Sequence, residues 1–228
     1  MKNILLVFTI LISVQSLIAQ PNEVNKTVDS LYREDQIYFS ITYNVIDNKL
    51  RNMSQNGFSG SFRLGFIRDF PINEERNLAL GLGFGLSTNS FNQNMKISET
   101  NSQFEYEVLS SGNFDKNKFD LYQFEIPFEF RWRTSTATDY KFWRIYSGFK
   151  IGYVFSSRAK FVGTDESYKI SINDAINRFQ YGATLSLGYD SWNIHIYYAL
   201  GTIFKDQHLE SQSIELKTIE AGLIFYIL

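Results

Sequence analysis

The chain of 228 residues contains no cysteine and only two histidines. The absence of cysteine excludes disulfide-linked folds, thiolate metal sites and thiol nucleophiles. The two histidines, His195 and His208, are too few for a multi-histidine metal centre. The sequence therefore predicts no metal site and no cofactor.

An excess of charge of either sign is also missing. Lys and Arg number 22 and Asp and Glu number 24, which leaves a net charge of −2. Proteins that bind nucleic acid through its phosphates need a basic surface. We therefore expect no nucleic-acid partner, and no motif identifies a small-molecule substrate.

Long hydrophobic runs are absent except at the N-terminus. Lys2 precedes an apolar segment from Ile4 to Ile12, and Ser16–Ala19 fits a signal-peptidase site before Gln20. This pattern predicts a signal peptide over residues 1–19, with an uncleaved anchor as the alternative. No later apolar run approaches the roughly 20 residues of a membrane-spanning helix.

From Ile37 onward, apolar residues alternate with polar or small ones, which is the pattern of β-strands with one apolar face. Eight such segments are predicted: Ile37–Val45, Phe58–Phe66, Leu78–Leu86, Tyr122–Arg133, Trp143–Phe155, Phe179–Tyr189, Trp192–Gly201 and Ile219–Ile227. Pro127 falls inside one of them, and proline within a strand usually marks a bulge. We therefore expect a local kink at Pro127.

The connections between these segments are alternately long and short. The long ones are Asp47–Gly57, Thr88–Lys118, Ser156–Asn177 and Lys205–Ile214, and the short ones are Phe70–Asn77, Thr134–Asp139 and Asp190–Ser191. Trp132, Trp143 and Trp192 all lie at short-turn ends, as an interfacial aromatic girdle would. Outer-membrane barrels combine such a girdle with short periplasmic turns, long external loops and an even strand number. The predicted fold is all-β, an eight-stranded antiparallel up-and-down transmembrane β-barrel over residues 36–228.

Charge and bulk decide which face of the strands lines the lumen. One parity carries charges on several strands, and the other carries large aromatic residues that would overfill an eight-stranded interior. We therefore place the apolar rows against lipid and the charges inside. The predicted interior charge cluster is Arg63, Glu125, Glu129, Arg131, Arg144, Lys150 and Glu220. Buried charges persist only when paired, so a salt-bridge plug is the favoured interpretation, with a proton path or a ligand site as alternatives.

Catalysis would require a nucleophile beside His195. Ser186 and Glu220 share its inward parity on the neighbouring segments, so a Ser/His/acid triad is conceivable. An interior histidine that only forms hydrogen bonds is the favoured interpretation, because the strand register is not fixed by the sequence. We predict no catalytic residue and no enzymatic activity, and keep a lipid-modifying barrel enzyme as the alternative.

Two further segments are candidates for partner contacts. Thr88–Lys118 mixes polar residues with aromatics, a composition that either docks a partner or packs over the barrel mouth. Residues 20–35 form a predicted periplasmic lead-in. Within it Val24, Val28 and Leu31 form an apolar stripe with Tyr32 at helical spacing, which fits either a contact element or a flexible lead-in.

Several blocks of the chain are shared with a known group of barrels. The main blocks are Arg33–Gln36, Gly65–Asp69, Glu125–Thr136, Lys141–Lys150 and Phe225–Leu228. In these blocks the chain resembles the PorT family, and the similarity covers essentially the whole mature sequence. PorT-like proteins are outer-membrane barrels of Bacteroidetes implicated in type IX secretion, which in gliding species is linked to gliding motility through delivery of surface adhesins.

The resemblance implies a location in the bacterial outer membrane and a role as an accessory or assembly component of type IX protein secretion. It implies outer-membrane lipid and other secretion-system or envelope proteins as partners, and it implies no catalytic residues. A general structural or porin-like small barrel with no role in secretion is the alternative.

Overall fold

The computed structural model describes residues 35–101, 103–110, 114–134 and 142–227. The predicted signal peptide and the lead-in, apart from Asp35, lie outside the described residues. Among the described residues, no helix is long and apolar enough to cross a membrane. The same residues contain one short 3₁₀ helix, η1 (Asn173–Ala175), and are otherwise strands and connections.

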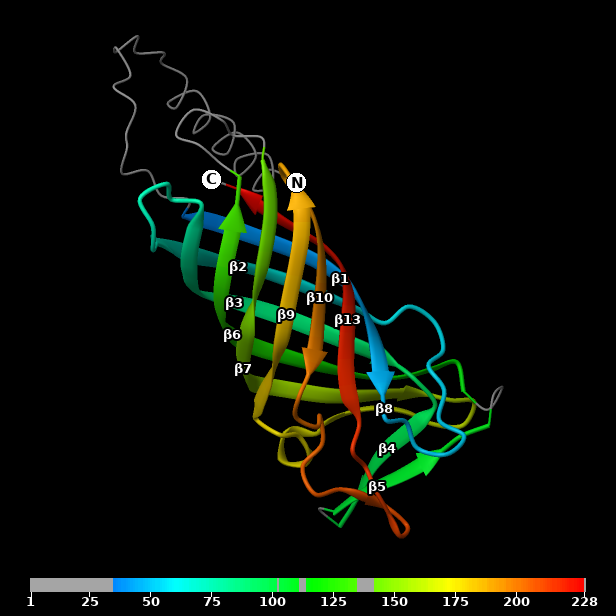
Figure 1. Ribbon diagram of the computed structural model, residues 1–228. Coiled ribbons are helices and arrows are strands. Elements are labelled where there is room, and N and C mark those ends of the chain that lie inside the picture. The colour runs from blue at the N-terminus through cyan, green and yellow to red at the C-terminus, as the bar shows by residue number, and fades with distance from the viewer. Residues whose placement is uncertain (1–34, 102, 111–113, 135–141, 228) are drawn as a thin grey trace, which may run out of the picture. The chain divides into compact units, whose positions relative to one another are not determined.

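Eight strands of the described chain form a closed antiparallel barrel (Figure 1). The barrel strands are β1 (Gln36–Asp47), β2 (Gly60–Pro71), β3 (Leu78–Asn92), β6 (Lys116–Arg133), β7 (Trp143–Val162), β9 (Phe179–Tyr189), β10 (Trp192–Ala199) and β13 (Lys217–Ile227). β1 pairs with both β2 and β13, so the first and last strands are neighbours. Pairing of β6 with β7 joins the two ends of the strand order and closes the barrel. The predicted fold class is confirmed.

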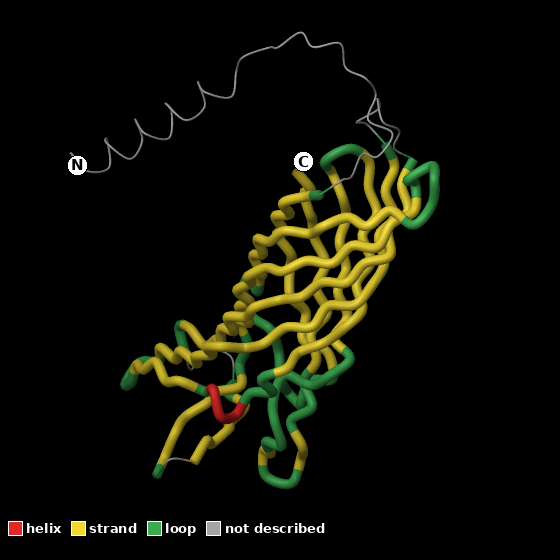
Figure 2. Tube along the Cα trace, turned by 90° about the vertical axis from the view of Figure 1, so that its left-hand side faces the viewer, coloured by secondary structure: helices red, strands yellow, loops and turns green. Residues whose placement is uncertain are grey.

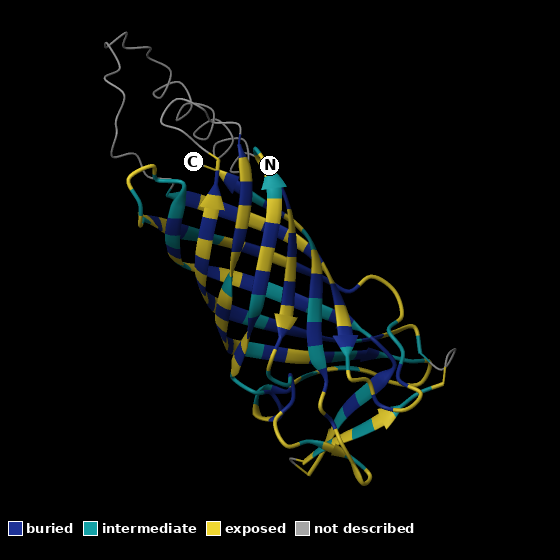
Figure 3. Cartoon of the chain, in the orientation of Figure 1, coloured by how far each residue is buried: buried dark blue, intermediate teal, exposed yellow. Residues whose placement is uncertain are grey.

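Burial alternates along each barrel strand (Figure 3). On β6 the side chains of Glu125, Glu129 and Arg131 are buried, while Phe128 and Phe130 between them are exposed. The same alternation runs through β1, where Ser40, Thr42 and Asn44 are buried between exposed Phe39, Ile41, Tyr43 and Val45. The polar rows therefore line the interior and the apolar rows face outward, as the sequence predicts.

The outward apolar row of β6 measures the height of the lipid-facing surface. It runs from Tyr122 to Trp132, which at a rise of about 3.4 Å per residue is about 34 Å along the strand. At the strand tilt of about 45° usual in membranes, this corresponds to about 24 Å along the membrane normal, close to the roughly 25 Å apolar band of outer-membrane barrels. We call this zone, between the levels of Trp132 and Tyr122, the apolar band.

The strands extend further than predicted at the end of the long connections. β3 continues to Asn92, β6 begins at Lys116 and β7 continues to Val162. Short strands occupy much of the remaining connections: β4 (Met95–Thr100), β5 (Gln103–Val108), β8 (Ser167–Ser171), β11 (His208–Leu209) and β12 (Gln212–Ser213). The interpretation of residues 88–118 and 156–177 as loops is therefore wrong for much of their length. Their polar composition hides an alternation in which one face is buried under neighbouring hairpins.

These connections share a hydrophobic core of their own, and Figure 2 shows them gathered at one end of the barrel strands. We call the described residues of 48–59, 93–115, 163–178 and 200–216 the dome. Phe204 of the dome packs on Phe119 of β6, with ring centroids 5.4 Å apart, and Phe119 stacks on Phe91 at 4.7 Å. The inward residues Leu121 and Val154 of the barrel wall belong to the same core. The long connections thus pack over the barrel mouth.

Pro127 lies in β6 without the bulge that a proline within a strand usually marks. The pairing of β3 with β6 skips Gly83 and Phe84, opposite Pro127 and Ile126, and resumes in the same register. The one register shift between β6 and β7 lies at Tyr122/Gln123 instead. A missing N–H removes ladder hydrogen bonds but inserts no residue. The strand therefore loses pairing to β3 at the proline and keeps its alignment.

The depth of the outward rows gives a first prediction. Leu82 lies opposite Phe128 near the middle of the apolar band, whereas Thr88 lies opposite Tyr122 at its edge. Leu82→Arg should destabilise the folded barrel by about 2–4 kcal/mol, and Thr88→Arg by about 0–1 kcal/mol, because the cost of a charge falls toward the interface. Chemical unfolding in phospholipid bilayers measures both. Equal losses at the two positions would contradict the assigned band.

Candidate functional site: the charged barrel interior

The central interior charges form one ion-pair network. Arg63 Nε lies 3.3 Å from Glu125 Oε2, and Arg63 also bonds Glu220 through Nη2. Lys150 Nζ lies 3.3 Å from Glu125 Oε1, which also accepts a hydrogen bond of 2.8 Å from Ser87. All four charged side chains are buried. Two cations and two carboxylates balance, so this network satisfies the requirement that buried charges be paired.

A second group of charges lies at the short-turn end of the barrel. Asp69 accepts hydrogen bonds from Arg133 at 2.8 and 3.0 Å and from Arg131 at 3.3 Å. Arg131 also contacts Glu129, with 3.0 Å between Nε and Oε2. Its guanidinium lies 4.6 Å from the ring centroid of Tyr146, a buried cation–π contact. One carboxylate thus holds two arginines that come from the same strand.

Arg144 is separate from both groups. In the described residues it forms no ion pair, and its guanidinium lies 4.4 Å from the ring of Phe142 and 5.9 Å from that of Tyr226. Of the seven predicted cluster residues, four form the central network, and Glu129 and Arg131 belong to the second group. Arg144 faces the interior as predicted but contacts aromatic rings.

Two interior charges were missed by the sequence analysis. Asp69 continues the inward alternation of Arg63, Gly65 and Ile67, just beyond the predicted end of that segment at Phe66. Arg133 repeats the parity of Arg131 at the last residue of its strand. Extending the period-two pattern by three residues would have found Asp69, so the signal was present.

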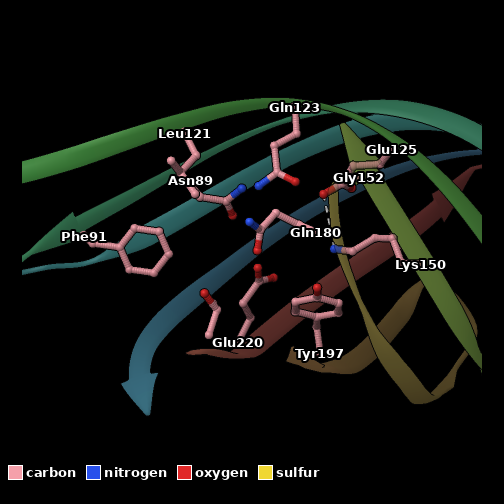
Figure 4. A pocket seen from close by; sticks show the side chains of 11 residues that line it. Asn89, Phe91, Leu121, Gln123, Glu125, Lys150, Gly152, Gln180, Tyr197 and Glu220 are labelled. Carbon is pink, nitrogen blue, oxygen red and sulfur yellow. Dashed lines mark ion pairs between the residues drawn. The ribbon is translucent and has the colours of Figure 1, made fainter. Parts of the chain in front are cut away.

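The space between the central network and the dome is almost filled. A cavity of about 10 Å³ remains there, bounded by side chains of both the network and the dome core. Figure 4 shows that the amides of Asn89, Gln123 and Gln180 point into the same space above Glu220. This volume is about that of one water-sized probe. This space therefore offers room for about one water molecule.

Ser186 and His195 lie directly opposite each other on β9 and β10. Ser186 Oγ is 2.8 Å from His195 Nδ1, and both side chains are buried. Glu220 lies opposite Tyr197, and in the described interior its hydrogen bond goes to Arg63 and none reaches His195. The structure thus contains a buried Ser186–His195 pair, but Glu220 does not complete the Ser/His/acid triad. The described residues also contain no group of three His, Asp or Glu side chains suited to a metal.

The sequence can now be compared with known proteins. Residues 18–205 match the family described as outer membrane protein beta-barrel domain. The chain belongs to this family. Among solved structures, it is similar to that of Ail, the attachment invasion locus protein of Yersinia pestis, with 16% identity over 86% of this chain and 100% of that chain and a TM-score of 0.35. The structure of Ail with the heparin analogue sucrose octasulfate covers the same shares at 16% identity, with a TM-score of 0.33. No curated protein sequence matches the chain.

Membership of this family locates the barrel in the outer membrane. The exposed aromatic and aliphatic rows then face lipid, and Trp132, Trp143 and Trp192 lie at the short-turn interface. In barrels of this class the short turns are periplasmic and the long connections are external. On this basis we assign the dome to the external side.

The central network gives a second prediction. Glu125→Gln removes the carboxylate shared by Arg63 and Lys150, which leaves two buried cations with one partner. Breaking a buried ion pair costs about 3–5 kcal/mol, and we expect this loss in the free energy of unfolding in bilayers or micelles.

Glu166→Gln is the matched control. Glu166 pairs with Lys96 at 2.5 Å on the dome, but its side chain is 54% exposed. Loss of a pair that is this exposed should cost no more than about 1 kcal/mol. Equal effects of the two substitutions would contradict a structural role for the interior network.

Proposed function

We propose that this barrel is a non-enzymatic outer-membrane protein that acts through its surfaces, as an accessory or assembly component of type IX secretion. The observation that carries the first half of the proposal is the filled lumen. The ion-pair network and the dome core leave a cavity of about 10 Å³ between them. Such an interior passes neither cargo nor solutes. The protein therefore acts through contacts made by the dome, the short turns and the lipid-facing wall.

The dome is suited to contact another protein because its hairpins are fixed by packing. The Tyr106 hydroxyl bonds Gln207 at 2.9 Å, and its ring meets that of Phe204 edge-on at 5.9 Å. Beside them a surface groove of about 700 Å³ lies between β5 and the β11–β12 hairpin, with Glu107 and Glu210 in its lining. A preorganised groove lowers the entropic cost of binding a partner segment.

The link to type IX secretion comes from the resemblance to the PorT family. Its longest block, Glu125–Thr136, covers the membrane part of β6 and carries both Glu125 of the central network and Arg131 and Arg133 of the second group. Glu125, Arg131 and Arg133, three of the residues that fill the lumen, thus lie within the stretch that resembles the family. This supports the same sealed architecture for the group and a role exerted through contacts.

Deletion of the gene tests the proposed role. We expect cargo with the C-terminal secretion signal to accumulate inside the cell and export to return on complementation with the wild-type gene. Complementation with Glu107→Lys/Glu210→Lys should restore export only partly, at an unchanged level of folded barrel, because it reverses two charges in the groove. Intact export in the deletion strain would favour a general envelope barrel without a role in secretion.

Affinity capture from gently solubilised outer membrane tests the same proposal through its partners. Recovery of secretion-machine subunits in a fixed ratio to the tagged barrel is the expected result, and the double groove variant should recover fewer of them. Recovery of the barrel alone would contradict the proposed contacts with secretion-machine subunits.

A lipid-modifying enzyme is a second candidate, favoured by the Ser186–His195 hydrogen bond. We expect His195→Gln to leave the outer-membrane lipid composition unchanged, because the pair is buried without access or an acid partner. Mass spectrometry of extracted lipid measures this. A defined lipid product that disappears in the variant, while the barrel stays folded, would establish the enzyme instead.

A further inference from the structure

Three lysines are cross-strand neighbours on three adjacent strands near the dome. Lys118 of β6 pairs with Lys160 of β7, and Lys160 pairs with Lys169 of β8. Directly opposite residues of antiparallel strands place their side chains on the same face, with Cβ atoms about 5 Å apart. The register therefore sets three ammonium groups in one row.

This row lies on the outward face of the barrel strands β6 and β7 and of the dome strand β8, which pairs with β7. The alternate residues Phe119, Ala159 and Ile170 pack into the dome core on the inner face. Lys116 and Arg158 lie two residues from Lys118 and Lys160 on the same strands and so share the outward face. We call Lys116, Lys118, Arg158, Lys160 and Lys169 the basic row.

The basic row has little compensating negative charge. Asp120 shares its face and bonds Lys118, with 2.8 Å between Nζ and Oδ1. In the described residues Lys160 and Lys169 form no ion pair, and Arg158 has only a distant contact with the ring of Tyr122 at 5.9 Å. Like charges placed directly opposite destabilise a sheet. An anionic ligand outside the protein would offset this cost.

The basic row lies just beyond the external edge of the apolar band. Lys118 is four residues past Tyr122, which at about 3.4 Å per residue and a tilt of about 45° is about 10 Å along the membrane normal. Arg158, opposite Asp120, lies about half as far beyond the edge. Flexible lysine stems extend along apolar surface, so their ammonium groups can reach the headgroup layer.

We propose that the basic row binds the phosphate groups of a phosphorylated glycolipid in the outer leaflet. Lysine and arginine donate charge-assisted hydrogen bonds to phosphate oxygens, which suits such a headgroup. Directly below, Phe124 and Phe155 lie with ring centroids 4.7 Å apart on the lipid-facing wall and provide an apolar surface for the acyl chains. The phosphate contacts on β6, β7 and β8 thus adjoin the acyl contacts on β6 and β7, as binding of one amphiphile requires. The proposal does not depend on a role in secretion.

The test uses the barrel purified in zwitterionic detergent and titrated with lipid A or with dephosphorylated lipid A. We expect Lys160→Gln/Lys169→Gln to weaken lipid A binding by about 30-fold, or about fivefold for each lysine near a membrane surface. The matched control, Lys49→Gln/Lys205→Gln, removes the same charge from exposed positions in the dome. It should change the affinity by less than about twofold if the position of the charge decides binding.

Each other outcome would overturn the proposal. Equal losses in the two double variants would show that only net charge matters. Equal binding of dephosphorylated lipid A would show that the phosphates are not recognised. Displacement of lipid A by equimolar inorganic phosphate would show that the row binds free anions. Without lipid, the variant at Lys160 and Lys169 should melt at the same or a higher temperature, because a repulsion is removed. A lower melting temperature would assign these lysines a structural role instead.

Discussion

The contact of Arg63 with two carboxylates, Glu125 and Glu220, is the interaction on which the rest of the structure depends. The space between this contact and the dome has room for about one water, so the buried charges there depend on partners on the wall. Arg144, which among the described residues contacts only aromatic rings, is the exception among the seven predicted charges. Arg63 reaches partners on two other strands and thereby ties three strands across the lumen. With Lys150 it produces a balanced network, and the network fills the space through which a solute would pass.

The filled interior determines where the protein can act. Asp69 and its two arginines close the short-turn side, while aromatic rings of the dome core close the other. Binding surfaces are then confined to the outside of the wall and to the two ends. The dome groove and the basic row are two such surfaces, and we propose different partners for them. In these proposals the groove receives a protein segment and the basic row receives the phosphates of a lipid.

The sequence was sufficient for the barrel because strand periodicity and lipid exposure impose the same alternation. Every predicted segment became a barrel strand, and the seven charges assigned to the interior by parity are buried, whereas Asp69 and Arg133 were not in that set. The strand pairing was harder to predict. The register shift at Tyr122/Gln123 reverses the parity of β7 beyond Phe155. The alignment of Lys118, Lys160 and Lys169 therefore could not be predicted without the register. The dome strands were missed because polar residues outnumber the few buried ones, and Asp69 because the pattern was ended too early. At Pro127 a local rule predicted a bulge where the ladder merely loses pairs.

The conductance of the purified barrel in a planar lipid bilayer tests the central claim most directly. We expect inserted wild-type protein to carry no stepwise ionic current, because paired charges and the dome core fill the lumen from both sides. Discrete, reproducible current steps from the folded wild-type barrel would contradict it. They would mean that the interior network lines a pathway, and the function would then have to be sought inside the barrel.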